Sequence, residues 1–313
     1  MMNRDSLRGP LLRSVSRSFY LSLRFLPKAL RDPLSLAYLL ARATDTIADT
    51  PEPPVALRTD ALRDLAAAIQ GSTPRGTADS LAPLQNDKAE RTLIEQLPAL
   101  LDWLGELPAD DRAEVRSVLI KINRGQSLDL QRFGAFGEIR ALKNAAELDE
   151  YTYLVAGCVG EFWTRLCFAH VKNFSTRPES EMRDLGIRYG QGLQLINILR
   201  DAGNDLRNGR CYFPADELDS LGLAPPEILR EPARIEPVMK KWIEKAEQDI
   251  EAGMEYASAI RNRRVRFATA LPAKIGKRTL ALLREAGPDA LTRRIKVPRG
   301  EVRKMIVSSA LSR

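Results

Sequence analysis

Apolar residues recur at intervals of three and four positions through most of the chain, which is the spacing of one face of an α-helix. Strictly alternating runs rich in Val, Ile and Thr, which would predict strands, are nearly absent. The pattern predicts helices over residues 11–26, 33–49, 57–70, 89–104, 110–132, 138–171, 179–207, 234–260, 264–285 and 299–311. We therefore expect an all-α protein.

Short segments rich in proline and glycine separate these helices. They are PEPP from Pro51, GSTPRGT from Gly71, Asn208-Gly209, Pro225-Pro226 and Gly287-Pro288. None is long enough to be an interdomain linker, so we expect a single domain over residues 1–313.

The segment DPLSLAYLLARATDTIADT carries one polar stripe on an otherwise apolar helix, with Asp32 expected as the N-cap and Pro33 at the first helical position. The stripe consists of residues at steps of four, three and four: Tyr38, Arg42, Asp45 and Asp49. Because the helix is apolar on both sides of the stripe, we expect the stripe to line a cavity. The charges of Asp45 and Asp49 repel at this spacing, which favours a cation between them. A solvated face with cations nearby is the alternative interpretation.

The segment LGIRYGQGLQLINILRDAGNDLRNGRCYFP repeats this pattern. Its stripe has steps of three, four and four: Gln194, Asn197, Asp201 and Asp205. Two such helices facing each other would present four carboxylates and an amide oxygen, which are hard ligands suited to Mg²⁺, with Mn²⁺ as the alternative ion. Four arginines flank the stripes: Arg42, Arg200, Arg207 and Arg210. Since Mg²⁺ shares its shell with phosphate oxygens and arginine complements them, we expect the combined site to bind a diphosphate leaving group.

Histidine and cysteine usage excludes several chemistries. The one histidine, His170, cannot support a zinc site built on paired histidines and would have to be the only base of a Ser-His-Asp hydrolase. The three cysteines, Cys158, Cys167 and Cys211, have no CxxC spacing and indicate buried thiols in a reducing compartment.

A formal net charge of +7 indicates an anionic partner, either a phosphorylated substrate, a membrane surface or a nucleic acid. The basic residues are spread through helices without aromatic interleaving, so we expect no nucleic acid partner. No apolar run approaches the ~18 to 20 residues needed to cross a bilayer, and no transmembrane anchor is expected. Gly190-Gln191-Gly192 begins a dinucleotide-binding pattern, but Leu195 stands at the third glycine position, so close helix packing explains these glycines better.

Four segments resemble the squalene and phytoene synthase family of trans-prenyltransferases and follow the family's order. They are SRSF from Ser16, YLLARATDTIAD from Tyr38, YTYLVAGCVG from Tyr151 and QLINILRDAGNDLRNGRCYFP from Gln194. The resemblance implies a single-domain isoprenoid synthase fold, which is a helical bundle around a central apolar cavity with two facing DxxxD helices.

The resemblance also implies a role for each matching residue. The implied Mg²⁺ ligands are Asp45, Asp49, Asn197, Asp201 and Asp205. The implied substrate contacts are Tyr38, Arg42, Gln194, Arg200 and Arg210, with Ser16, Arg17 and Ser18 in a flap over the pocket. Tyr151 matches a tyrosine that handles a proton, and we expect it to be catalytic together with the four aspartates. A buried phenol that anchors a helix is the alternative for Tyr151.

Two features look more like squalene synthases than phytoene synthases. The first acidic motif has Thr46 where carotenoid enzymes usually show a second adjacent Asp. The segments ALPAKIGKRTLALL and IKVPRGEV look like the end of squalene synthases, whose basic residues there bind NADPH. The implied NADPH contacts are Arg17, Arg42, Lys296 and Arg299. Pro298 departs from this pattern, because the position is usually Arg.

The resemblance implies a squalene synthase that joins two farnesyl diphosphates head to head through presqualene diphosphate and reduces the product with NADPH. Related enzymes that make presqualene diphosphate, hydroxysqualene, dehydrosqualene or phytoene are alternatives. A non-catalytic assembly protein of the same fold is disfavoured, because all four metal-binding aspartates are present.

The substrate and product are greasy, so we expect peripheral contact with a membrane. We further expect a cytoplasmic monomer or weak homo-oligomer that serves sterol or hopanoid biosynthesis.

Overall fold

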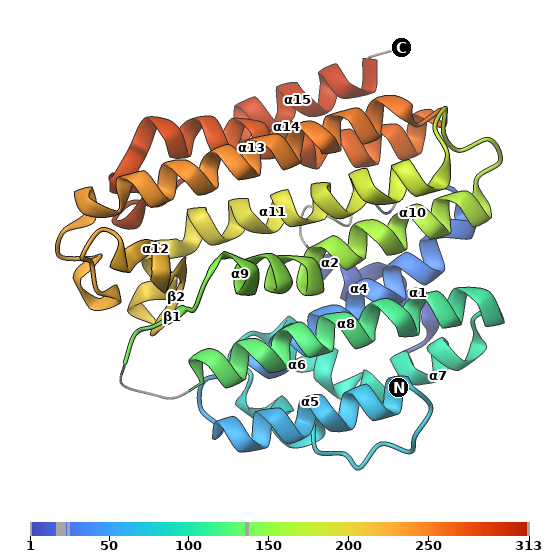
Figure 1. The fold of residues 1–313 in the computed structure, drawn as a ribbon. Helices are drawn as coiled ribbons and strands as arrows, with labels where there is room; N and C mark the ends of the chain where they lie inside the picture. The colour runs from blue at the N-terminus through green and yellow to red at the C-terminus, as the bar shows by residue number, and fades with distance from the viewer. Residues whose placement is uncertain (1, 17–22, 24–25, 135–137, 312–313) are drawn as a thin grey trace. The chain divides into compact units, whose positions relative to one another are not determined.

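The computed structural model describes residues 2–16, 23, 26–134 and 138–311 (Figure 1). Helices dominate the described residues, so the all-α prediction is confirmed. The chain forms two compact units, one of residues 1–131 with 165–172 and one of residues 132–164 with 173–313. The single domain over residues 1–313 stays a prediction.

The first unit is built around the long helix α4, Lys28–Asp49. Its other elements are α1 (Arg4–Ser6), the π-helix η1 (Leu7–Leu11), α2 (Leu12–Ser16), α5 (Val55–Ile69), the 3₁₀-helix η2 (Asp79–Leu84), α6 (Lys88–Glu95), α7 (Leu97–Glu106) and most of α8 (Ala109–Phe133). Helices α2, α5, α6 and α7 all pack on α4. Leu36, Leu39, Leu40 and Ile47 of α4 are completely buried, so most of this helix faces protein.

Helix α4 begins five residues before the predicted start, so the prediction of Asp32 as N-cap is wrong. The helix starts at Lys28 after Pro27, whose ψ of 145° is outside the helical range. Pro33 lies inside the helix, where it removes one backbone hydrogen bond. The Asp32 carboxylate instead accepts a hydrogen bond of 2.9 Å from Arg8 Nη1.

The second unit is organised around α11, Glu179–Arg207. Its other elements are β1 (Arg140–Leu142), α9 (Ala145–Thr152), the π-helix η3 (Tyr153–Gly157), the first part of α10 (Cys158–His170), β2 (Arg210–Pro214), α12 (Ala215–Asp219), the 3₁₀-helices η4 (Pro225–Glu227), η5 (Pro232–Ile235) and η6 (Gly287–Leu291), α13 (Glu236–Ala259), α14 (Arg263–Ala286) and α15 (Arg299–Leu311). Helix α11 packs on α13, α13 on α14 and α14 on α15, and these four helices run as successive rows (Figure 1).

The predicted helix over residues 138–171 is wrong at its start. Residues Arg140–Leu142 form β1, which pairs in parallel with β2, so that Arg140 lies opposite Arg210. The following helix begins only at Ala145, because the side chain of Asn144 accepts a hydrogen bond of 3.1 Å from the Glu147 N–H and caps it. The short ladder places Cys211, Tyr212 and Phe213 in the core of this unit.

Two glycines of α11 allow the close helix packing that the sequence predicts. A Cβ at Gly192 would lie 2.7 Å from the Asp249 Cβ of α13, and one at Gly190 would collide with the carbonyl of Ala156 in η3. Any larger residue would therefore push α11 away from its neighbours. This packing fixes the helix that carries the second acidic stripe.

The cysteines agree with the sequence prediction of buried thiols. All three cysteines are buried and none is in a disulfide. Burial raises the pKa of Cys211 to about 12, which keeps this thiol protonated and unreactive at neutral pH. In the part of the chain that the structure describes, no helix combines the length and apolar character needed to span a bilayer.

Candidate functional site

Helix α4 presents the first acidic stripe at its accessible face. Tyr38, Arg42 and Asp45 are half-buried and Asp49 is exposed, while Ala43, Thr44, Thr46, Ile47 and Ala48 between them are buried. The stripe therefore lies on one side of the helix, as its spacing predicts.

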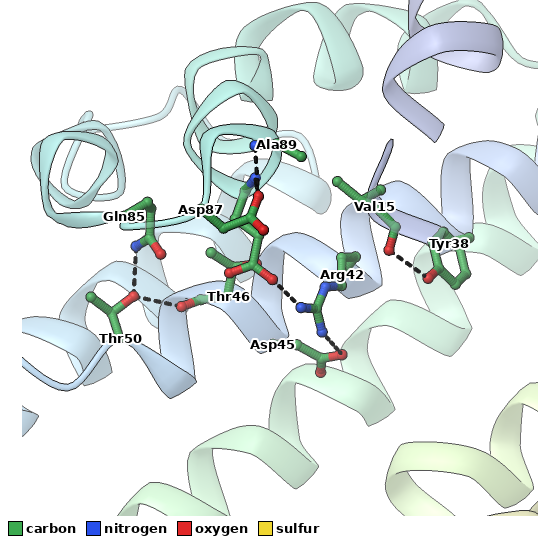
Figure 2. A network of polar contacts seen from close by, with 10 residues as sticks. Val15, Tyr38, Arg42, Asp45, Thr46, Thr50, Gln85, Asp87 and Ala89 are labelled. Atoms are coloured by element: carbon green, nitrogen blue, oxygen red, sulfur yellow. Dashed lines mark hydrogen bonds and ion pairs between the residues drawn. The ribbon is translucent and has the colours of Figure 1, made fainter. Parts of the chain in front are cut away.

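Arg42 makes ion pairs on two sides. Its Nη2 donates a short hydrogen bond to Glu90 Oε1 of α6, and its Nη1 lies 3.8 Å from Asp45 Oδ2. Figure 2 shows the guanidinium directed at the Asp45 carboxylate. Burial lowers the pKa of Arg42, but the charges of Glu90 and Asp45 outweigh it and the net pKa is raised. Arg42 is therefore charged and held between two carboxylates.

Asp45 is held by a third helix. Gln126 of α8 donates from Nε2 to Asp45 Oδ1 at 2.5 Å. Burial and the charge of Asp49 raise the pKa of Asp45 to about 7, although 36% of its side chain is exposed. We attribute this to a recessed carboxylate that has more protein than water around it and a like charge one turn away. Such a pair gains from a nearby cation, so these residues fit Mg²⁺.

The remaining predicted residues of the first unit lie close to the stripe or outside the described residues. The Tyr38 hydroxyl donates to the carbonyl oxygen of Val15 at 3.3 Å, as Figure 2 shows, and burial raises the pKa of Tyr38. The buried Ser16 hydroxyl donates to Leu12 O at 2.5 Å within its own helix. Arg17 and Ser18 lie outside the described residues.

In the second stripe, on α11, Arg200 contacts the aspartate next to it. Its Nε donates to Asp201 Oδ1 at 2.9 Å and its Nη2 to Asp201 Oδ2 at 2.5 Å. These two hydrogen bonds raise the pKa of Arg200, and the charges of Asp201 and Asp205 add to the shift. The guanidinium therefore occupies both oxygens of Asp201 in a bidentate pair.

The other residues of the second stripe remain accessible. The exposed Asn197 donates from Nδ2 to Gln194 Oε1 at 3.3 Å. Asp205 near the end of α11 lies close to Arg210 and Tyr212 of β2. The amide oxygen of Asn197 and the carboxylates of this stripe are donors of the type that Mg²⁺ prefers.

Tyr151 lies in an aromatic cluster of the second unit. Its side chain is on α9 and is buried, and its ring stacks on Tyr212 with 5.1 Å between centroids. The Tyr212 hydroxyl donates to the Tyr151 oxygen at 3.4 Å, and Phe133 meets the Tyr212 ring edge-on at 5.2 Å. The phenol oxygen of Tyr151 is therefore held by a second phenol.

The predicted NADPH residues of the second unit lie near its C-terminal end. Lys296 and Pro298 are exposed between η6 and α15, and the exposed Arg299 is the first residue of α15. These cations suit the phosphates of a nucleotide by their charge and accessibility.

No three His, Cys, Asp or Glu side chains among residues 2–16, 23, 26–134 and 138–311 gather into a closed metal site. Each stripe instead carries a pair of carboxylates one helical turn apart, and on α11 one of the two, Asp201, is paired with Arg200. A carboxylate pair suits Mg²⁺, which completes its shell with water and phosphate oxygens. The facing of the two stripes stays a prediction, because they belong to different units.

Comparison with known proteins identifies the family. A family model of squalene/phytoene synthase matches residues 12–301. The bifunctional lycopene cyclase/phytoene synthase of Phaeosphaeria nodorum is 30% identical over 241 residues, which are 75% of this chain but only 38% of that protein. The presqualene diphosphate synthase of Rhodopseudomonas palustris is 27% identical over 275 residues, which are 86% of this chain and 83% of that protein.

Among solved structures, a complex of TcSQS with the ligand E5700 has the same fold, with a TM-score of 0.80 and 21% identity over 98% of this chain and 87% of that chain. The fold that the sequence predicts is thereby confirmed as the isoprenoid synthase fold of squalene synthases. The chain belongs to the squalene/phytoene synthase family, whose members are prenyltransferases that condense isoprenyl diphosphates.

Proposed function

We propose that this chain is a Mg²⁺-dependent squalene synthase, which joins two farnesyl diphosphates head to head to presqualene diphosphate and reduces it with NADPH to squalene. The observation that carries the proposal is the pair of stripes on α4 and α11, each with a DxxxD pair and an arginine in contact with it. Family membership supports the reaction class.

The aspartates of both stripes and Asn197 would hold Mg²⁺. The bound ion would act as a Lewis acid on the leaving diphosphate. Asp45 and Asp49 favour a cation because their charges repel and because Asp45 is recessed. On α11, Arg200 would give up Asp201 to a divalent ion and turn to the diphosphate.

The arginines would stabilise the charge that develops on the leaving group. Arg42 and Arg200 each lie beside an aspartate of their stripe before substrate binds, so both guanidinium groups are already next to the carboxylates assigned to Mg²⁺. Tyr38, Gln194 and Arg210 lie on or next to the same stripes and would orient the diphosphate by hydrogen bonds.

The aromatic cluster would serve the carbocation side of the reaction. Ring faces favour positive charge and offer no nucleophile. Tyr212 donates to the Tyr151 oxygen, and this hydrogen bond would stabilise the oxygen while Tyr151 gives up or takes back a proton.

The reductive step would use the exposed cations at the C-terminal end. Lys296 and Arg299, together with Arg17 and Arg42, would bind the phosphates of NADPH. Hydride transfer from NADPH to the rearranged cation would then give squalene.

A second candidate is a synthase that releases presqualene diphosphate without reducing it. It is favoured by the Rhodopseudomonas palustris relative, which is matched over 83% of its own length and is a presqualene diphosphate synthase. Pro298, in the segment assigned to NADPH, fits this alternative as well.

The deciding experiment incubates the pure protein with farnesyl diphosphate and Mg²⁺, with and without NADPH, and identifies the products by mass spectrometry. Squalene is expected only with NADPH, and presqualene diphosphate without it. Presqualene diphosphate under both conditions would favour the second candidate. A hydroxylated product, or a C40 product from geranylgeranyl diphosphate alone, would contradict both.

We also propose peripheral contact with a membrane, from which a greasy substrate would enter. The net charge of +7 supports attraction to anionic lipid. Sedimentation with anionic vesicles, compared with neutral ones, tests this contact.

A further inference from the structure

Glu90 contacts the first stripe but has no role in the reaction described above. It is the third residue of α6, and 26% of its side chain is exposed. Its Oε1 accepts the short hydrogen bond from Arg42 Nη2. An acidic residue that reaches from a neighbouring helix to a diphosphate-binding arginine needs an explanation.

The backbone of Glu90 is fixed by the start of its own helix. Asp87 is the N-cap of α6, and its Oδ1 accepts from the Ala89 N–H at 2.7 Å and the Glu90 N–H at 3.3 Å. Figure 2 shows the bond between Asp87 and Ala89. The first turn of α6 therefore has a defined position relative to α4, on which α6 packs.

The side chain of Glu90 does not make the local contact that its position offers. Asp87 and Glu90 have the spacing of a capping box, in which the glutamate would accept a hydrogen bond from the N-cap N–H. Glu90 instead accepts from Arg42 on α4. The Glu90 side chain thus connects α6 to α4 rather than capping the N-terminus of α6.

The Arg42 guanidinium is held from two sides. Glu90 contacts Nη2, while Asp45 lies 3.8 Å from Nη1. Within the described part of the chain, the buried Nε has no hydrogen-bond partner. Among the described residues, Glu90 therefore accepts the hydrogen bond that anchors this long side chain in the absence of substrate.

We infer that Glu90 is a positioning residue, which holds Arg42 beside Asp45 and is exchanged for the diphosphate when substrate binds. The inference rests on the proposed function, because it assigns Arg42 to the diphosphate. A carboxylate repels a diphosphate, so Glu90 weakens ground-state binding while it keeps Arg42 in the geometry needed for ionisation.

This role predicts that removing Glu90 lowers kcat without raising KM. Without Glu90 the guanidinium is less well placed, so ionisation slows. At the same time the diphosphate no longer competes with a carboxylate for Arg42, so binding does not weaken. A residue needed only for folding would lower the amount of active protein and leave KM and pyrophosphate affinity unchanged.

The test compares Glu90→Gln and Glu90→Ala with Glu95→Gln, which makes the same charge change at an exposed position of the same helix. We expect kcat with farnesyl diphosphate to fall about tenfold for Glu90→Gln and about a hundredfold for Glu90→Ala, on the scale of a misplaced catalytic group. The Kd for inorganic pyrophosphate with Mg²⁺, measured by calorimetry on the full chain, should be two- to fivefold lower, roughly the effect of removing one nearby like charge. Glu95→Gln should change neither quantity.

Two results would overturn the inference. One is an unchanged kcat in Glu90→Gln, and the other is a Kd for pyrophosphate that rises as kcat falls, because Glu90 would then promote binding rather than compete with it. Glu90→Gln keeps the size of the side chain, so it decides the matter if Glu90→Ala fails to fold. A wild-type chain that condenses nothing overturns the proposed function, whereas an active wild type with normal Glu90 variants overturns this inference alone.

Discussion

In the stripe on α4 the arginine is drawn toward a neighbouring helix, whereas in the stripe on α11 it folds back onto the aspartate beside it. Arg42 donates to Glu90 and is 3.8 Å from Asp45. Arg200 makes two hydrogen bonds to Asp201, at 2.9 Å and 2.5 Å. Both stripes carry a DxxxD pair and an arginine, but the balance of charge differs between them.

Because of this difference, we expect the two stripes to gain unequally from a bound cation. Asp45 shares its arginine with Glu90 and faces the charge of Asp49, and its pKa is raised to about 7. Asp201 has a complete guanidinium partner. The α4 pair therefore gains more from a metal ion, while the α11 pair must first lose Arg200.

The largest expected effect is a loss of kcat that is equal for the two stripes. Asp45→Asn and Asp201→Asn should each lower kcat by about 10³-fold or more, because each removes a charge assigned to Mg²⁺ in the transition state. Asp184→Asn, at an exposed position of α11, should leave kcat unchanged. Steady-state kinetics with farnesyl diphosphate measures the effect, and circular dichroism checks the fold. Activity within tenfold of wild type in either variant would contradict the assignment of that stripe.

The next effect tests the hydrogen bond that Gln126 of α8 makes to the α4 stripe. Gln126→Ala removes the 2.5 Å hydrogen bond to Asp45 Oδ1. We expect kcat to fall about three- to tenfold, the size of one typical hydrogen bond. Gln131→Ala, at an exposed position of the same helix, is the matched control. Equal kcat in the two variants would mean that the amide does not orient Asp45.

Binding of Mg²⁺ without diphosphate should distinguish the stripes. A saturating concentration of Mg²⁺, near ten times its Kd, stabilises a folded protein by about 1.4 kcal/mol, or roughly 3–5 °C in Tm. Asp45→Asn should remove most of this shift, because Asp45 shares Arg42 with Glu90 and faces the like charge of Asp49. Asp201→Asn should keep most of it, since Arg200 already neutralises that carboxylate. Thermal denaturation with and without Mg²⁺ measures both, and an equal loss would show that the stripes do not differ.

The sequence predicts the stripes well but not their partners. The steps of three and four that place Asp45 and Asp49 on one face are local properties of a helix, so periodicity finds them. Glu90 and Gln126 reach α4 from helices that begin 39 and 60 residues after its own last residue, Asp49, and periodicity carries no information about such contacts. The capping-box spacing of Asp87 and Glu90 even favours a local role for Glu90.

The sequence did not predict the short parallel ladder of β1 and β2, because this ladder is also a contact between distant elements. Residues 140–142 have too few positions for an alternating pattern, and their pairing with β2 is formed across α9, α10 and α11. The glycines of α11 show the opposite case, because a glycine pair in an apolar helix indicates close packing whatever the neighbour is. Patterns within one element were predictable, and contacts between elements were not.

The smallest expected effect is a pH dependence of stability that tests the raised pKa of Asp45. The pKa of Asp45 is about 7 in the folded chain against an ordinary value of 3.8. A raised pKa means that the folded state binds the proton more tightly, so the stabilising contribution is complete below pH ~4 and is lost as the pH rises through ~7. In metal-free buffer, Asp45→Asn should therefore have a higher Tm than wild type at pH 8 and a similar Tm at pH 4.

We expect the gain at pH 8 to be roughly 1–3 °C, because solvent at this partly exposed carboxylate screens the repulsion from Asp49. Asp201→Asn should instead lower the Tm slightly at pH 8, since it removes a bidentate ion pair. Adding Mg²⁺ should reverse the order of wild type and Asp45→Asn, because the ion binds the carboxylate form. Parallel Tm curves for the two proteins from pH 4 to pH 8 would mean that Asp45 has its ordinary pKa, and the two stripes would then have the same need for a cation.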